Sequence, residues 1–141
     1  MTYATLEDLI ERAGAAEIRQ IADRDRDGTP DPDVIDAALS DADNLIDGYV
    51  STKYTLPLPS VPDIVNTWAV SIARYVLHRN GAPEHVRQDY KDAVAALKDV
   101  AAGKLALPFP SGEDQPGVAS GQVKARHPDR VFTPQKLRGW R

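Results

Sequence analysis

The sequence contains no cysteine among its 141 residues. This absence excludes a disulfide framework, a zinc site built on thiolates and a cysteine nucleophile. It does not identify the cellular compartment.

Signals that would direct or anchor the chain at a membrane are also missing. The opening residues, MTYATLEDLIERAG, contain no basic segment followed by an apolar run, so we expect no secretion signal. The most apolar long segment, residues 61–80, carries Asp63 and Arg74, which argue against a membrane span. We expect no contact with a membrane.

Sequence motifs for catalysis are absent as well. There is no glycine-rich phosphate loop and no nucleophile elbow. The three histidines, His78, His85 and His127, do not show the paired helical spacing of a metal site. We therefore expect that the protein is not an enzyme.

What is present is the composition of an ordinary globular domain, with 42% hydrophobic and 27% charged residues. The charge is divided unevenly along the chain. Residues 1–103 hold ten Lys/Arg against eighteen Asp/Glu, whereas residues 104–141 hold seven against three. Gly103 favours the end of the last predicted helix, and the composition changes after it. We therefore expect a helical bundle domain over 1–103, followed by a linker and a basic C-terminal arm over 104–141. An acidic body is not typical of a general nucleic-acid binder.

The segment from Val61 to Asn80 predicts the central helix of the bundle. Pro62 suits a first helical turn, and Asn80-Gly81 favours a stop just after His78. The apolar residues recur at helical spacing and form a wide stripe, which predicts enclosure by neighbouring helices. The stripe consists of Ile64, Trp68, Ile72, Tyr75 and Val76, widened by Val65, Ala69 and Ala73.

Four further helices are predicted around this one. The first spans Leu6–Ala13, with Thr5 and Asp8 as a capping box, and the second spans Ala15–Ala22. The third begins at Pro32 and the last runs from Pro83 to Gly103. The predicted fold class is all-α: a small bundle of about four to five helices with an extended proline-containing connection over 53–62. The C-terminal arm is expected to be largely irregular.

An acidic turn precedes the third helix. Aspartates at alternate positions followed by a glycine match the first half of a calcium-binding loop, in which oxygen atoms converge on one hard cation. The candidate ligands are Asp23, Asp25, Asp27, the carbonyl of Thr29, and Asp31. The twelfth position, which normally supplies a bidentate carboxylate, is Val34. Asp33 or Asp36 would substitute only with a different loop geometry.

Two interpretations of this turn stay open. Either it binds a cation, for which calcium is the expected cofactor, or it is an acidic turn without a cofactor. In the second case Asp31 caps the next helix and Pro32 begins it.

The third helix and the arm supply an unlike pair of candidate interaction surfaces. The helix presents acidic residues on the face opposite its apolar stripe, and the arm mixes basic with aromatic residues. The candidate residues on the helix are Asp36, Asp43 and Asp47. Those on the arm are Lys124, Arg126, Arg130, Phe132, Lys136 and Trp140. The arm can dock on a neighbour or on its own bundle, and the sequence leaves both open.

Several segments occur together in a characteristic order. They are YATLEDLIER (3–12), DRDRDG (23–28), DADNLIDGYVSTKYTLPL (41–58), VPDIVNTWAVSIARYVLH (61–78) and RVFTPQKLRGW (130–140). With these segments the chain resembles the Mu-like bacteriophage and prophage family of small virion-assembly proteins.

The resemblance implies a structural protein of the virion, similar to the head-completion adaptors that join the head to the tail. Such adaptors assemble as rings beneath the portal. The implied partners are copies of the chain itself, the portal protein and tail-side connector proteins, with DNA only as cargo in the channel. The implied location is the virion, and the bacterial host cytoplasm during assembly. The alternative is a calcium-binding helical interaction module organised by Asp23–Asp31.

Overall fold

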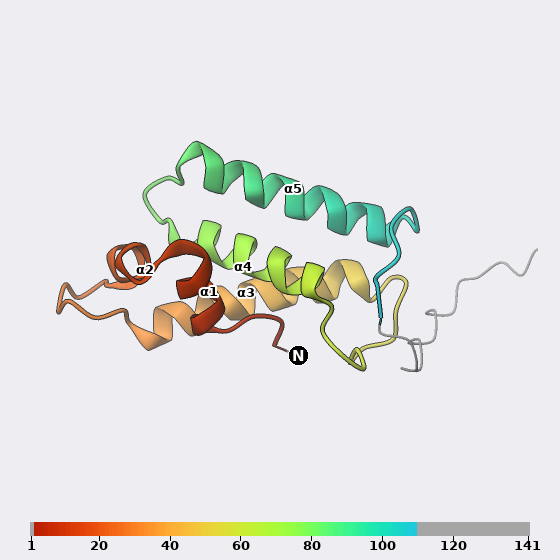
Figure 1. The fold of residues 1–141 in the computed structure, drawn as a ribbon, viewed down its shortest axis with the longest axis horizontal. Coiled ribbons are helices and arrows are strands. Elements are labelled where there is room, and N and C mark those ends of the chain that lie inside the picture. Colours follow the sequence, from red (N-terminus) through yellow and green to blue (C-terminus); the bar gives the residue numbers. More distant parts are fainter. Residues whose placement is uncertain (1, 110–141) are drawn as a thin grey trace, which may run out of the picture.

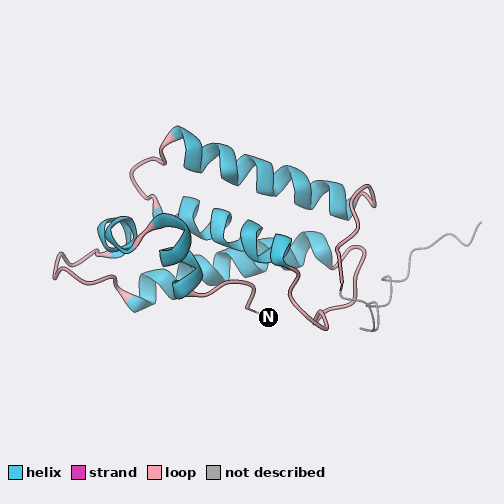
Figure 2. Ribbon diagram, viewed as in Figure 1, coloured by secondary structure: helices cyan, strands magenta, loops and turns pink. Residues whose placement is uncertain are grey.

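A computed structural model describes residues 2–109, and all of their regular structure is helical (Figure 2). The helices are α1 (Leu6–Ala13), α2 (Ala15–Ala22), α3 (Pro32–Val50), α4 (Asp63–Leu77) and α5 (Glu84–Ala101). The predicted all-α bundle is therefore confirmed for this part of the chain. Residues 110–141, with most of the predicted arm, lie outside the described residues.

Helix α4 is the central helix, as its sequence predicts. It packs against α3 on one side and α5 on another, while α1 also contacts it. Figure 1 shows α3, α4 and α5 extending together along the longest dimension of the molecule. The inward surface of α4 combines small and larger residues, including Val65, Ala69 and Ile72, whose exposed fractions are 1% or less. Small residues such as Ala69 let neighbouring helices approach closely, so α4 becomes the core of the bundle.

Two residues of the predicted apolar stripe are exposed instead. Ile64 and Val76, near the two ends of α4, are 37% and 38% exposed, whereas Val70 and Leu77 are buried. The prediction was wrong here because α4 is apolar around most of its circumference. The periodicity alone therefore could not identify which flank would lack a neighbour.

The short helices α1 and α2 lie at one end of the bundle (Figure 1). Thr5 and Asp8 form the predicted capping box: the Thr5 N–H donates to Asp8 Oδ2 at 2.9 Å, and the Asp8 N–H donates to Thr5 Oγ1 at 3.3 Å. Gly14 separates the helices with φ of 90°, a conformation that favours glycine. Leu9 and Ile18 are fully buried and anchor the pair to the core.

The opposite end of the bundle is closed by two irregular segments. The first, residues 53–62, is called the strap; it contributes the buried Leu58 and has a cis peptide bond between Leu56 and Pro57. The second follows α5, where the Leu107 N–H donates to the Tyr54 hydroxyl at 2.9 Å. The first residues of the predicted arm thus pack on the bundle. No helix within residues 2–109 combines the length and apolar character needed to cross a bilayer.

Candidate functional site

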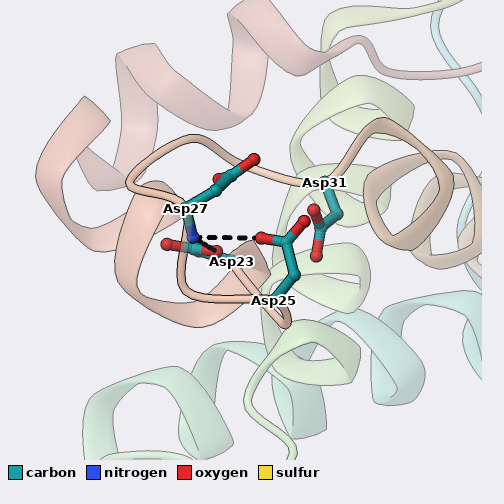
Figure 3. A group of neighbouring side chains, drawn as sticks. All are labelled: Asp23, Asp25, Asp27 and Asp31. Atoms are coloured by element: carbon teal, nitrogen blue, oxygen red, sulfur yellow. Dashed lines mark hydrogen bonds between the residues drawn. The ribbon is translucent and has the colours of Figure 1, made fainter.

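The acidic loop between α2 and α3 brings four aspartates together. Asp23, Asp25, Asp27 and Asp31 each place a carboxylate oxygen within 4.8 Å of the others, and the group is half-buried to exposed. Figure 3 shows the four side chains gathered around the acidic loop. Three of the four follow one another at alternate positions, and Asp31 reaches the group from the start of α3. The structure therefore assembles the carboxylates that the sequence proposed as ligands.

The loop backbone determines this arrangement. Two left-handed residues, Arg26 with φ of 63° and Gly28 with φ of 90°, turn the chain sharply around the aspartates. The Asp27 N–H donates to Asp23 Oδ1 and to Asp25 Oδ1, both at 3.1 Å (Figure 3). The Gly28 N–H donates to Asp23 Oδ2 at 2.9 Å. These main-chain donors hold the carboxylates in place.

Asp31 occupies the N-cap of α3, and Pro32 begins the helix, as the capping interpretation predicts. The side chain, however, does not cap the helix. Asp31 Oδ2 accepts a hydrogen bond from the Arg24 N–H at 2.7 Å, so the carboxylate turns back to the acidic loop. The backbone of Asp31 therefore starts α3, while its carboxylate belongs to the acidic loop.

The electrostatics of the loop follow from the crowded charges. Hydrogen bonds from the Thr29 N–H and Thr29 Oγ1, both at 2.8 Å to Asp27 Oδ1, lower the pKa of Asp27. At Asp25 the hydrogen bond from the Asp27 N–H works in the same direction, but it is outweighed. Partial desolvation, the Asp23 carboxylate and the neighbouring charges raise the pKa of Asp25. A divalent cation would relieve this repulsion.

The fit to a calcium loop is incomplete. Calcium takes six to eight oxygen ligands, and about two of them normally come from a bidentate carboxylate at the twelfth position. That position is the half-buried Val34, and neither Asp33 nor Asp36 belongs to the convergent group. Thr29 contributes hydrogen bonds to Asp27 through its amide and hydroxyl. The side chains present could hold a cation only with additional oxygen ligands from the main chain or water.

The acidic residues of α3 have two different environments. Asp36 is exposed, as a docking surface requires, whereas Asp43 and Asp47 are half-buried. The Tyr3 N–H donates to Asp43 Oδ1 at 3.0 Å, and the Tyr3 hydroxyl donates to Asp47 Oδ1. Burial raises the pKa of Asp43, and the charge of Asp47 adds to the rise. The N-terminal segment thus covers part of the helix face that the sequence assigned to solvent.

The arm residues proposed as the other half of the interaction lie outside the described residues. They are Lys124, Arg126, Arg130, Phe132, Lys136 and Trp140. Whether they contact Asp36, Asp43 or Asp47 stays a prediction.

Sequence reasoning missed two polar clusters that join distant segments. Tyr3 was not singled out, although it is 2% exposed and bonds to α3. Arg74 of α4 makes two hydrogen bonds of 2.9 Å to the Glu17 carboxylate on α2. His78 Nε2 lies 3.6 Å from Glu17 Oε1. Arg74 and His78, at the C-terminal end of α4, therefore face α2 and tie it to the bundle.

Comparison with known proteins finds relatives among bacteriophage and prophage proteins. The family model described as "Bacteriophage Mu, Gp36" matches residues 3–125. The Mu-like prophage FluMu protein gp36 of Haemophilus influenzae is 38% identical over 105 residues, which cover 74% of each chain. Gene product J of Escherichia phage Mu is 32% identical over 122 residues, which cover 81% of this chain and 86% of that protein.

Proposed function

This chain belongs to the bacteriophage Mu Gp36 family, and from that membership we propose that it is a structural protein of virion assembly. More specifically, it acts as a head-completion adaptor that assembles as a ring beneath the portal and connects the head to the tail. The family match across residues 3–125 is the observation that carries this proposal. In this role the chain has no catalytic activity and works in the virion, after assembly in the host cytoplasm.

The shape of the bundle supports a role in assembly. Helices α3, α4 and α5 pack around one shared core. Because close-packed cores resist deformation, such a bundle suits a subunit that must keep its shape within an assembly. A ring of identical subunits requires heterologous contacts, in which one surface meets a different one on the next copy. The exposed Asp36 on α3 and the basic arm from residue 123 provide two surfaces of opposite charge.

Deletion of residues 123–141 tests whether the connector role depends on the basic arm. In cells carrying a Mu-like prophage that lacks its own copy, we expect the truncated protein to fold but to leave heads and tails unjoined. Electron microscopy of the lysate measures the fraction of joined particles. The control is a deletion of residues 111–116, which shortens only the linker and keeps the arm. Joined particles at the full-length level with the 123–141 deletion would contradict the proposed role of the arm.

The acidic surface on α3 can be tested with two charge-reversal substitutions, one at the proposed contact and one away from it. Asp36 and Asp41 are both exposed on α3, but they are five residues apart and therefore point about 140° from each other. We expect Asp36→Lys to reduce particle joining and Asp41→Lys to leave it unchanged. Equal loss in both variants would indicate a nonspecific effect of charge reversal and count against the assigned surface.

Calcium binding is a second candidate function, favoured by the convergence of the four aspartates within 4.8 Å. Sites with dissociation constants of about 0.1–1 mM would stabilise the fold by about 1–3 kcal/mol in 10 mM calcium. We expect a rise in Tm that Asp25→Asn removes and Asp33→Asn, an exposed aspartate outside the cluster, retains. Thermal melts with calcium, with magnesium and without added cation measure it. No calcium-dependent shift, or an equal shift in both variants, would exclude this site.

A further inference from the structure

An apolar groove lies between the end of the strap and the segment that follows α5. Val61, Pro62, Asp63 and Ile64 form one side of the groove, and Pro108 and Phe109 form the other. Its volume is about 580 Å³, within the range of about 300–1,000 Å³ that is typical of ligand pockets. Ile64 is 37% exposed there, although most of the large apolar residues of α4 are buried.

The wall of this groove is held firmly by the bundle. The Leu107 N–H donates to the Tyr54 hydroxyl at 2.9 Å, and Leu107 itself is buried. The rings of Tyr54 and Phe109 pack at a centroid distance of 6.0 Å with an interplanar angle of 58°. The groove is thus a preformed surface between two segments that are far apart in the sequence.

The chain beyond Phe109 starts at the edge of this groove. Residues 110–122 are rich in Gly, Ser and Pro, and 13-residue chains of such composition generally have an end-to-end distance of about 20 Å. Residues 123–141 are therefore held close to the groove at an effective concentration in the millimolar range. No partner has to be recruited for the groove to be covered.

The chemistry of residues 123–141 complements the groove. They include four large apolar residues, Val131, Phe132, Leu137 and Trp140. They also carry six Lys/Arg against one Asp, whereas Asp63 at the groove and the excess of Asp/Glu in residues 1–103 are negative. Apolar contact and opposite charge therefore favour the same occupant.

We propose that residues 123–141 dock in this groove of their own chain before the subunit assembles. The arm is then stored on the bundle, its aromatic residues are withdrawn from water, and the contacts proposed for assembly require its release. The inference concerns the free subunit and stands or falls separately from the connector role.

The absence of cysteine allows a direct test in the full-length protein. Gln135→Cys provides one attachment site for a nitroxide spin label, which broadens the NMR signals of nearby amides. We expect strong broadening at Ile64 and Phe109 and much weaker broadening at Val76, which lies about 18 Å further along α4. Ile64→Asp should abolish the broadening. Val76→Asp is the matched control, because that side chain is 38% exposed on the same helix, and it should retain the broadening.

Mixing the label and the isotope on different chains identifies which copy supplies the arm. When ¹⁵N-labelled chains without a nitroxide are mixed with unlabelled chains that carry it, docking within one chain gives no broadening. Broadening in the mixture would show that a second copy fills the groove and would overturn the proposal. Absence of broadening in the singly labelled chain, or its persistence in Ile64→Asp, would overturn it as well. A docked arm in a protein whose truncated form still joins particles would leave this inference intact and would refute only the role proposed for the arm in joining heads to tails.

Discussion

The hydrogen bond between Tyr3 and Asp47 gives the most direct test of how the N-terminal segment contributes to stability. Tyr3 is 2% exposed, and its hydroxyl donates to a carboxylate on α3, 44 residues further along the chain. The substitution Tyr3→Phe removes the hydroxyl and keeps the aromatic ring in the core. A hydrogen bond to a charged group contributes about 1.5–3 kcal/mol. Because Asp47 is only half-buried, water can replace part of the interaction, and we expect a loss of about 1–2 kcal/mol.

This loss converts into a measurable shift in Tm. An unfolding entropy of about 2.1 cal/mol/K per residue, applied to the part of the chain that the structure describes, gives about 0.23 kcal/mol/K. Tyr3→Phe should therefore lower Tm by about 4–9 °C in a calorimetric melt. Tyr90→Phe is the control, because Tyr90 stacks on Tyr75 at a centroid distance of 4.1 Å and contributes through its ring. A Tm unchanged by Tyr3→Phe, or lowered equally by both substitutions, would refute the role of the hydroxyl.

The pH dependence of stability provides an independent test of the same hydrogen bond. Burial, followed by the hydrogen bond to Asp47, raises the pKa of Tyr3 above its usual value of about 10. The folded state therefore keeps the Tyr3 proton at a pH where the unfolded state has lost it. The stability from this residue is fully present below pH of about 10 and declines at higher pH. The difference between the wild-type protein and Tyr3→Phe should shrink as the pH rises above 10; a constant difference would contradict the assignment.

Two further predictions concern the cluster that joins α2 to α4. Glu17→Gln leaves the Arg74 guanidinium, whose side chain is 12% exposed, without its carboxylate partner, and should lower the free energy of unfolding by about 1–3 kcal/mol in urea titrations. Glu11→Gln, on the exposed surface of α1, is its control and should change stability by less than about 0.5 kcal/mol. The pKa of His78 is lowered, mainly by burial, so the unfolded state takes up a proton first and stability falls as the pH drops below about 6.5. His78→Gln should weaken this loss of stability between pH 7 and 5, whereas the control His85→Gln should retain it. Equal pH profiles for the wild-type protein and His78→Gln would contradict the prediction.

Local sequence signals determined the helices well. The bounds predicted for α1 and α2, Leu6–Ala13 and Ala15–Ala22, agree with the structure, because the capping box and Gly14 act within a few residues. Pro32 and Pro83 likewise mark the starts of α3 and α5, where a residue without an N–H fits. The acidic loop was also predictable, since alternate aspartates before a glycine are a short-range pattern.

Only the tertiary structure decided which faces of these helices meet water. Asp43 and Asp47 lie on the polar side of α3. Tyr3, which is 40 and 44 residues away in the sequence, nevertheless covers them. Ile64 and Val76 belong to an apolar stripe, yet the neighbours of α4 leave both exposed. Helical periodicity records the character of each face but not the position of its neighbours, and those positions follow from how all five helices pack together.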